Sequence, residues 1–168
     1  MNRKNFLHHT TAGLAGLLVV PSLTFADDAK KPEPLKTEIV KEFVGAGHNN
    51  LSRVKEMLAE YPNLLFSRYD WGNGDFEEAI EGAGHVGDKE IANYLITQGA
   101  RVNLFILTML GKTSLVKPIL EAYPQLIFAK GAHGFTLLHH AKRGGDDAKE
   151  LLAYLEEKGL KEMQYKIK

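Results

Sequence analysis

The sequence predicts an all-α protein built from about four helix-turn-helix repeats. Three observations predict this class. Apolar residues recur at helical spacing in several segments of about ten residues, the segments are separated by Gly, Pro and Asn, and parts of the chain resemble one another. A single helix pair has no partner for its apolar face, so the pairs are expected to stack into one solenoid with a continuous core.

Composition restricts the classes of function. The 168 residues are 44% hydrophobic and 25% charged, which is typical of one soluble domain. Lys plus Arg and Asp plus Glu both number 21, so no excess charge attracts nucleic acid or an anionic membrane. The chain has no cysteine, which excludes disulfides, thiolate metal ligands and a cysteine nucleophile.

Residues 1–26 have the layout of a secretory signal peptide. Arg3 and Lys4 precede an uncharged apolar run (12–20), and Ala26 ends a stretch of small residues suited to signal peptidase. An amphipathic or buried N-terminal helix is the alternative. Residues 3–7 also resemble the twin-arginine export motif, with Lys4 in place of the second arginine, so a general secretory route stays open. We expect cleavage after about Ala26, a periplasmic or secreted protein, and no membrane span once the signal is removed.

A charged, proline-containing leader (27–35) is expected to precede a single repeat domain (36–168). Residues 58–66 resemble residues 120–128. Five of the nine positions are identical, and these include the Tyr-Pro pair. A second similarity relates the Gly-Ala-Gly-His sequences at 45–48 and 82–85, which lie 37 residues apart. These similarities indicate internal repeats.

The periodicity predicts four first helices and four second helices. The first helices are expected near 37–47, 78–86, 104–111 and 136–143, and the second helices near 51–60, 88–97, 114–122 and 147–158. Asp88 and Thr113 are expected to be N-caps. Glycines are expected to supply positive φ at the turns, at positions 47, 87, 99, 111, 145 and 159.

Residues 134–141 read Gly-Phe-Thr-Leu-Leu-His-His-Ala, and residues 84–103 contain a predicted second helix that is followed by Gly-Ala-Arg-Val-Asn. These two stretches resemble the two halves of the ankyrin repeat, although Leu137 stands where the family usually has proline. The resemblance implies an irregular ankyrin-like solenoid. Long finger-like connections would follow repeats one and three (66–76 and 128–135), and the connection at 99–104 would be too short for a finger. The tetratricopeptide repeat is the alternative fold.

The same resemblance implies that a partner protein docks on the finger tips and the first helices. The residues at those positions are Tyr69, Asp70, Trp71, Asn73, Glu81, His85, Lys130 and His133. Trp71, the only tryptophan, is either an exposed anchor for a partner or a cover for a gap in the irregular stack. The resemblance also implies that His139 bonds to backbone and ties one repeat to the next.

No complete catalytic constellation is recognisable in the sequence. His139 and His140 are adjacent and point about 100° apart on a helix, which disfavours a shared metal ion. His48 and His85 follow glycines near helix ends, where local turn bonding is the expected role. Glu81 and His85 have the four-residue spacing of two ligands on one helix face, but no third ligand is evident.

The sequence therefore predicts an exported, monomeric, non-catalytic protein–protein interaction module with no metal and no cofactor. Its partner is expected to be another protein and not nucleic acid. Two alternatives stay open. The first is a periplasmic protein that binds a small molecule or a metal, and the second is an enzyme that uses Glu81 and His85.

Overall fold

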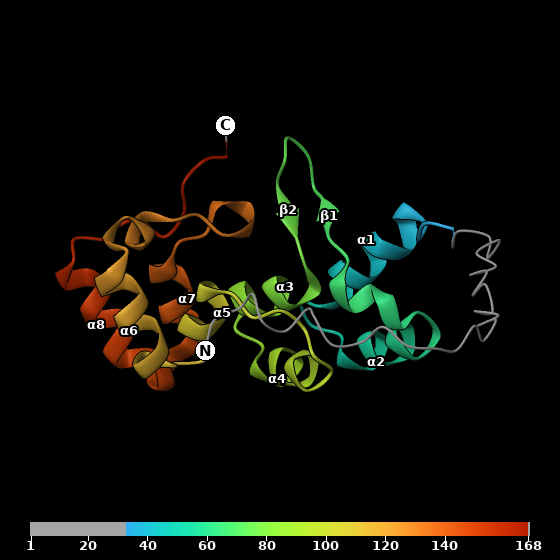
Figure 1. The fold of residues 1–168 in the computed structure, drawn as a ribbon, viewed down its shortest axis with the longest axis horizontal. Coiled ribbons are helices and arrows are strands. Elements are labelled where there is room, and N and C mark those ends of the chain that lie inside the picture. Colours follow the sequence, from blue (N-terminus) through green and yellow to red (C-terminus); the bar gives the residue numbers. More distant parts are fainter. Residues whose placement is uncertain (1–32, 168) are drawn as a thin grey trace, which may run out of the picture. The chain divides into compact units, whose positions relative to one another are not determined.

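A computed structural model describes residues 33–167 of the protein. The expected signal peptide and most of the leader lie outside the described residues. Eight α-helices occur in the described part of the chain (Figure 1): α1 (Thr37–Ala46), α2 (Leu51–Glu60), α3 (Ala79–Val86), α4 (Lys89–Thr97), α5 (Leu104–Met109), α6 (Thr113–Ala122), α7 (Leu137–Gly144) and α8 (Lys149–Glu157). The prediction of a mainly helical protein is confirmed.

The helices pair in chain order, and the first helices of successive pairs contact each other. Contacts join α1 to α2, α3 to α4, α5 to α6, and α7 to α8. The first helices form a row in which α1 contacts α3, α3 contacts α5, and α5 contacts α7. Residues on α3 can therefore meet groups from both neighbouring pairs.

The observed helix bounds lie within two residues of the predicted ones at each end. Asp88 is the N-cap of α4, and its carboxylate accepts a hydrogen bond from the backbone N–H of Ile91. The expectation for Thr113 is wrong, because Lys112 is the N-cap of α6 and Thr113 is the first helical residue.

The expectation of positive φ is correct for five of the six glycines and wrong for Gly47, whose φ is −55°. Glycine is needed at position 47 for a different reason. A Cβ at this position would overlap the backbone of Ala79, so glycine allows the end of α1 to lie directly against the start of α3.

Two long connections leave the helical layers. The first finger (residues 67–78) holds the antiparallel strands β1 (Tyr69–Asp70) and β2 (Phe76–Glu77), with Tyr69 opposite Glu77. The second finger (residues 129–136) contains the short 3-10 turn η4 (Ala132–Gly134). Each finger follows another 3-10 turn, η2 (Pro62–Phe66) or η3 (Pro124–Phe128). A further turn, η5 (Gly145–Ala148), leads into α8.

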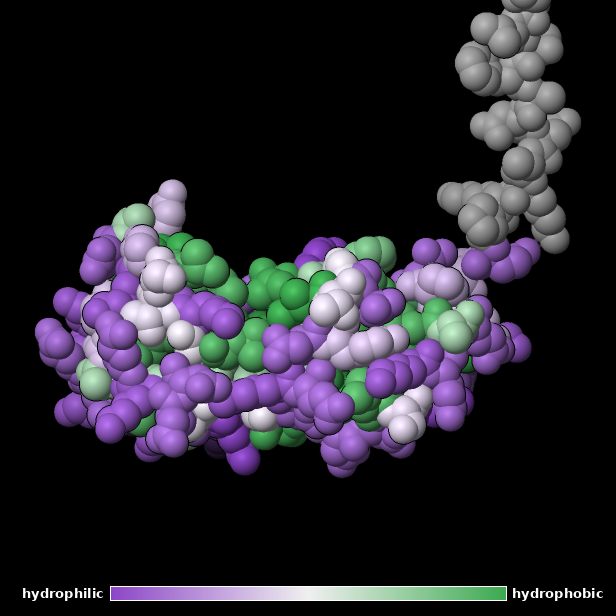
Figure 2. Space-filling view, turned by 90° about the horizontal axis from the view of Figure 1, so that it is seen from below, coloured by the Kyte–Doolittle hydropathy of each residue, from purple (hydrophilic) through white to green (hydrophobic). Residues whose placement is uncertain are grey.

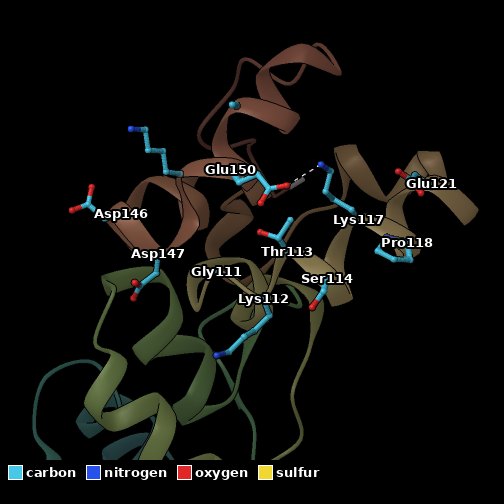
Figure 3. Close-up of a pocket in the computed structure, with 12 residues that line it drawn as sticks. Gly111, Lys112, Thr113, Ser114, Lys117, Pro118, Glu121, Asp146, Asp147 and Glu150 are labelled. Atoms are coloured by element: carbon cyan, nitrogen blue, oxygen red, sulfur yellow. Dashed lines mark hydrogen bonds and ion pairs between the residues drawn. The ribbon is translucent and has the colours of Figure 1, made fainter.

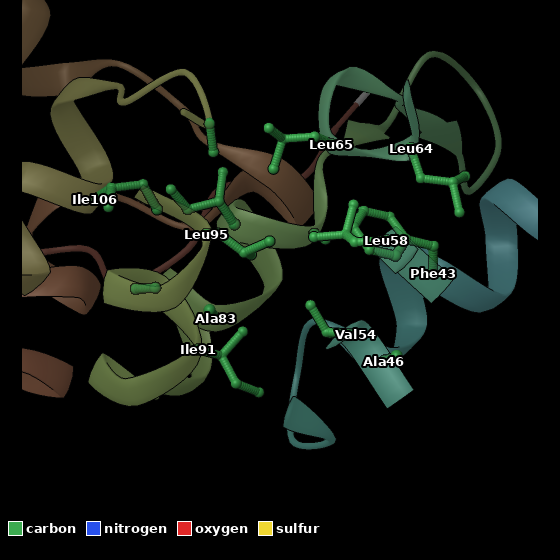
Figure 4. Close-up of a cluster of buried hydrophobic side chains, with 14 of the residues drawn as sticks. Phe43, Ala46, Val54, Leu58, Leu64, Leu65, Ala83, Ile91, Leu95 and Ile106 are labelled. Carbon is green, nitrogen blue, oxygen red and sulfur yellow. The ribbon is translucent and has the colours of Figure 1, made fainter. Parts of the chain in front are cut away.

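Two groups of buried hydrophobic side chains hold the helices together. The first joins α1 to α5 and includes Phe43, Val54, Leu64, Ile91, Leu95 and Ile106 (Figure 4). The second joins α6 to α8 and includes Val116, Leu120, Leu137, Leu151 and Leu155. Leu104 and Phe105 of α5 pack against the second group while Ile106 belongs to the first, so α5 links the two.

The face seen from the side of α2 and α4 is mainly hydrophilic, and hydrophobic residues gather along one edge of it (Figure 2). None of the helices in residues 33–167 has the length and apolar character needed to cross a membrane.

Candidate metal centre

Four side chains from four separate segments converge between the fingers and the row of first helices. His48 follows α1, Glu77 ends β2, His85 lies on α3, and His133 belongs to the second finger. One potential ligand atom from each of them lies within 4.8 Å of every other. Three imidazole nitrogens and one carboxylate oxygen therefore surround a single point.

Glu77 is the centre of this cluster. Its side chain is fully buried, and its charged partners within residues 33–167 are histidines rather than Lys or Arg. The Oε1 atom lies 2.8 Å from Nε2 of His85 and 3.5 Å from Nε2 of both His48 and His133. The Oε2 atom accepts a 2.7 Å hydrogen bond from Nε1 of Trp71. A buried carboxylate of this kind requires a compensating positive charge.

His48 is held in the form that a metal ligand requires. Its Nδ1 atom lies 3.2 Å from the carbonyl oxygens of Val44 and Gly45. A carbonyl oxygen only accepts hydrogen bonds, so Nδ1 carries the hydrogen. In the neutral ring the lone pair is then on Nε2, which lies 3.1 Å from Nε2 of His85.

His133 is oriented in the same way by a carboxylate. Its Nδ1–H donates a 2.7 Å hydrogen bond to Oδ2 of Asp75, and its backbone N–H donates a 2.8 Å bond to Oδ1 of the same residue. The carboxylate fixes the ring and leaves the Nε2 lone pair directed toward Glu77. A carboxylate behind a histidine is the usual outer partner of a metal-bound imidazole.

His85 lies between the other two imidazoles. Its ring meets those of His48 and His133 edge-on, with centroids 4.8 and 5.2 Å away, and stacks on Phe135 at 5.0 Å. The backbone oxygen of His85 accepts a 2.7 Å bond from Nε2 of His139 on α7. His139 thus bonds to backbone as the sequence resemblance implied, but it joins the fourth helix pair to the second and not to the adjacent third pair.

Burial disfavours the charged form of the two histidines of α7. Desolvation lowers the pKa of His139, and the bond to the His85 carbonyl only partly opposes that effect. Desolvation lowers the pKa of His140 to about 4, and its Nδ1 bonds to the carbonyl oxygen of Thr136. Both rings are occupied by structural bonds and stand outside the four-residue cluster.

Three of the residues predicted to bind a partner are brought together here: Trp71, His85 and His133. The ring of Tyr69 meets Trp71 edge-on at 4.8 Å, and Asp70 accepts a bond from the N–H of Gly72 in the finger turn. Trp71 is 38% exposed, and its Nε1–H is bonded to Glu77.

The other predicted residues have separate surroundings. Asn73 adopts a positive φ at the tip of the first finger. Lys130 lies over the ring of Tyr165 near the C-terminus. Glu81 accepts bonds from the N–H of Glu78 and the amide of Asn103, both 2.8 Å long. Glu81 therefore takes part in capping the N-terminus of α3 and does not join the cluster around His85.

His48, Glu77 and Asp75 were not recognised as site residues in the sequence. The repeated Gly-Ala-Gly-His sequence was the available signal, because equivalent positions of neighbouring first helices lie side by side in a stack. Glu77 and Asp75 had no comparable signal, because their positions depend on how the first finger folds.

The structure also has an open groove that is separate from this cluster. This groove of about 1110 Å³ is lined by residues of α6, η5 and α8 (Figure 3). Lys117 and Glu150 face each other across it, 3.1 Å apart. Its lining mixes both signs of charge and contains none of the four clustered residues.

Comparison with protein-family models and with curated proteins finds no match for this chain. The candidate site therefore stands on its geometry.

Proposed function

We propose that this protein binds one divalent transition-metal ion through Nε2 of His48, His85 and His133 and Oε1 of Glu77. The observation that carries the proposal is the buried carboxylate of Glu77, which lies among three imidazoles and no fixed cation of the described chain. A bound cation would compensate this charge directly. The proposal takes up the metal-binding alternative and includes no catalytic step.

The ligand set favours zinc. Three imidazoles and one carboxylate suit Zn²⁺, and a site without thiolates is poorly suited to Cu(I) or an iron–sulfur cluster. Neighbouring ligands of a tetrahedral zinc ion are about 3.3 Å apart, given metal–ligand distances of about 2.0–2.1 Å. Four of the separations run from 2.8 to 3.5 Å and every pair lies within 4.8 Å, so side-chain adjustments would bring the four atoms to bonding distance.

Groups outside the ligands support the proposal further. The carbonyls of Val44 and Gly45 hold His48, Asp75 holds His133, and the indole of Trp71 holds Glu77. Such partners orient the ligands before an ion arrives and raise affinity. Surface clusters of acids and histidines do not require this second layer.

The test is a zinc titration of the full chain in competition with a chromogenic chelator. We expect one ion per chain and at least a hundredfold loss of affinity in Glu77→Gln. The control is Glu56→Gln, which makes the same chemical change on an exposed surface. The proposal is wrong if the wild-type chain fails to compete with a micromolar chelator, or if both variants bind like wild type.

We also propose that the helix pairs are ankyrin-like repeats on which a protein partner docks after export. The row of contacting first helices supports the repeat assignment. Phe66 and Phe76 support docking, because about half of each side chain is exposed beside the first finger. Cross-linking in the native cell tests the docking surface, and the mass of the exported protein tests cleavage after Ala26.

A further inference from the structure

The chain after α8 returns to the second finger. Leu160 is buried in the core of the last helix pair, and the following residues run antiparallel to the second finger, with Gln164 opposite Phe135. The N–H of Thr136 donates to the carbonyl of Met163 at 3.0 Å, and the N–H of Tyr165 donates to the carbonyl of Gly134 at 2.9 Å. We call residues 162–165 the C-terminal strap.

His133 has an unusual backbone conformation that needs external support. Its φ is +56°, a region that non-glycine residues adopt rarely and at a cost in free energy. Asp75 holds the residue from the side of the first finger, as described above. On the other side, Nε2 of Gln164 donates a 2.8 Å hydrogen bond to the carbonyl oxygen of His133.

The strap and the second finger fit each other closely. A Cβ at Gly134 would overlap the carbonyl oxygen of Tyr165, so glycine is needed for the strap to approach. The hydroxyl of Thr136 donates a 2.6 Å bond to the carbonyl of Glu162. Lys130 adds a contact over the ring of Tyr165, 5.6 Å from its centroid. The second-finger residues that make these contacts lie both before and after His133 in the sequence.

We propose that the C-terminal strap positions His133 for metal binding and so sets the affinity of the metal centre. This inference rests on the proposed metal-binding function. No hydrogen bond or ion pair of the described residues joins the strap to His48, Glu77 or His85. When the strap is released, His133 loses a support for its positive φ and can turn its Nε2 away, which leaves the ion with three protein ligands.

Two matched pairs of variants test the strap in the full chain. Gln164→Ala removes the bond to the His133 carbonyl, and Tyr165→Pro removes the backbone donor to Gly134. We expect Gln164→Ala to lower zinc affinity about fivefold, which corresponds to the loss of one hydrogen bond. Tyr165→Pro should lower zinc affinity tenfold or more. Lys161→Ala and Tyr165→Phe keep every strap bond and should stay within about twofold of wild type.

A double-mutant cycle separates positioning from general stability. If the strap acts through His133, Gln164→Ala will weaken zinc binding in the wild-type background and change nothing further in His133→Ala. The Co²⁺-loaded chain gives a second readout, because loss of the His133 ligand alters the visible absorption spectrum. Circular dichroism of the metal-free variants verifies that they are folded.

The outcomes for the two levels of the proposal are distinct. If wild type fails to bind zinc, the proposed function is wrong. If wild type binds zinc but Gln164→Ala and Tyr165→Pro bind equally well, the strap has no positioning role. An equal loss in the wild-type and His133→Ala backgrounds would also overturn the inference, because the strap would then act independently of His133.

Discussion

Nε2 of His85 lies 2.8 Å from Oε1 of Glu77, although the two residues belong to different elements. Glu77 ends the hairpin of the first finger, and His85 lies on the last turn of α3. The carboxylate turns back over the helix that follows it and meets an imidazole from the row of first helices. Zinc binding would draw these two atoms and the other two histidines onto one ion.

Zinc should stabilise the folded protein, because the four ligands converge only in the native state. At a free concentration of about 100 times the dissociation constant, a bound ligand adds roughly 2.7 kcal/mol to the free energy of unfolding. For a domain of this size we expect the Tm to rise by about 10 °C. Differential scanning calorimetry with and without zinc measures the shift, and Glu77→Gln should show almost none.

Asp75→Asn should weaken zinc binding about 10- to 100-fold while the ligands themselves stay unchanged. The variant loses the carboxylate that accepts the Nδ1–H of His133 and orients its ring. Asp70→Asn is the matched control on the same finger, because Asp70 bonds only to the turn at Gly72 in the described contacts. Equal affinities for the two variants would show that the Asp75 carboxylate does not support the centre.

The fluorescence of Trp71 should report zinc binding directly. Trp71 is the only tryptophan, and its Nε1 lies 2.7 Å from Oε2 of Glu77. An ion on Oε1 withdraws charge from the carboxylate and alters the environment of the indole. The emission should change with the same midpoint as chelator competition. Trp71→Phe should lower affinity about tenfold, because a charge-assisted hydrogen bond is lost.

Acid should destabilise the protein through His140. Burial lowers its pKa to about 4 in the folded state, whereas the unfolded value is near 6.5. Between these values the unfolded chain binds the extra proton, so stability is present above about pH 6.5 and decreases as the pH falls toward 4. Protonation of His140 in the unfolded chain should lower the free energy of unfolding by about 3 kcal/mol over this pH range. Urea unfolding from pH 7 to pH 4 should show a shallower decrease for His140→Phe than for wild type.

The helices were predictable from local signals. Apolar spacing, glycine at turns and the Asp88 cap identified all eight α-helices of residues 33–167. The errors were local as well: the N-cap of α6 was placed one position too late, at Thr113 instead of Lys112, and Gly47 serves close packing rather than a positive φ.

The residues of the candidate metal centre were only partly predictable. The sequence assigned His48 to local bonding, and its Nδ1 does bond to the carbonyls of Val44 and Gly45. The same bond leaves Nε2 available, which the sequence did not reveal. The meeting of Asp75 and His133 spans 58 residues and depends on the conformations of both fingers. No periodic pattern encodes such a contact.

The short connection between α4 and α5 has a consequence for how such a site can arise. Successive helix pairs are joined there by residues 98–103 alone, while the fingers on either side are long enough to touch through Asp75 and His133. A third finger of similar length at this position would stand between them and keep the two residues apart. Redesign toward identical, evenly spaced helix pairs would therefore separate Asp75 from His133 and remove the candidate metal centre.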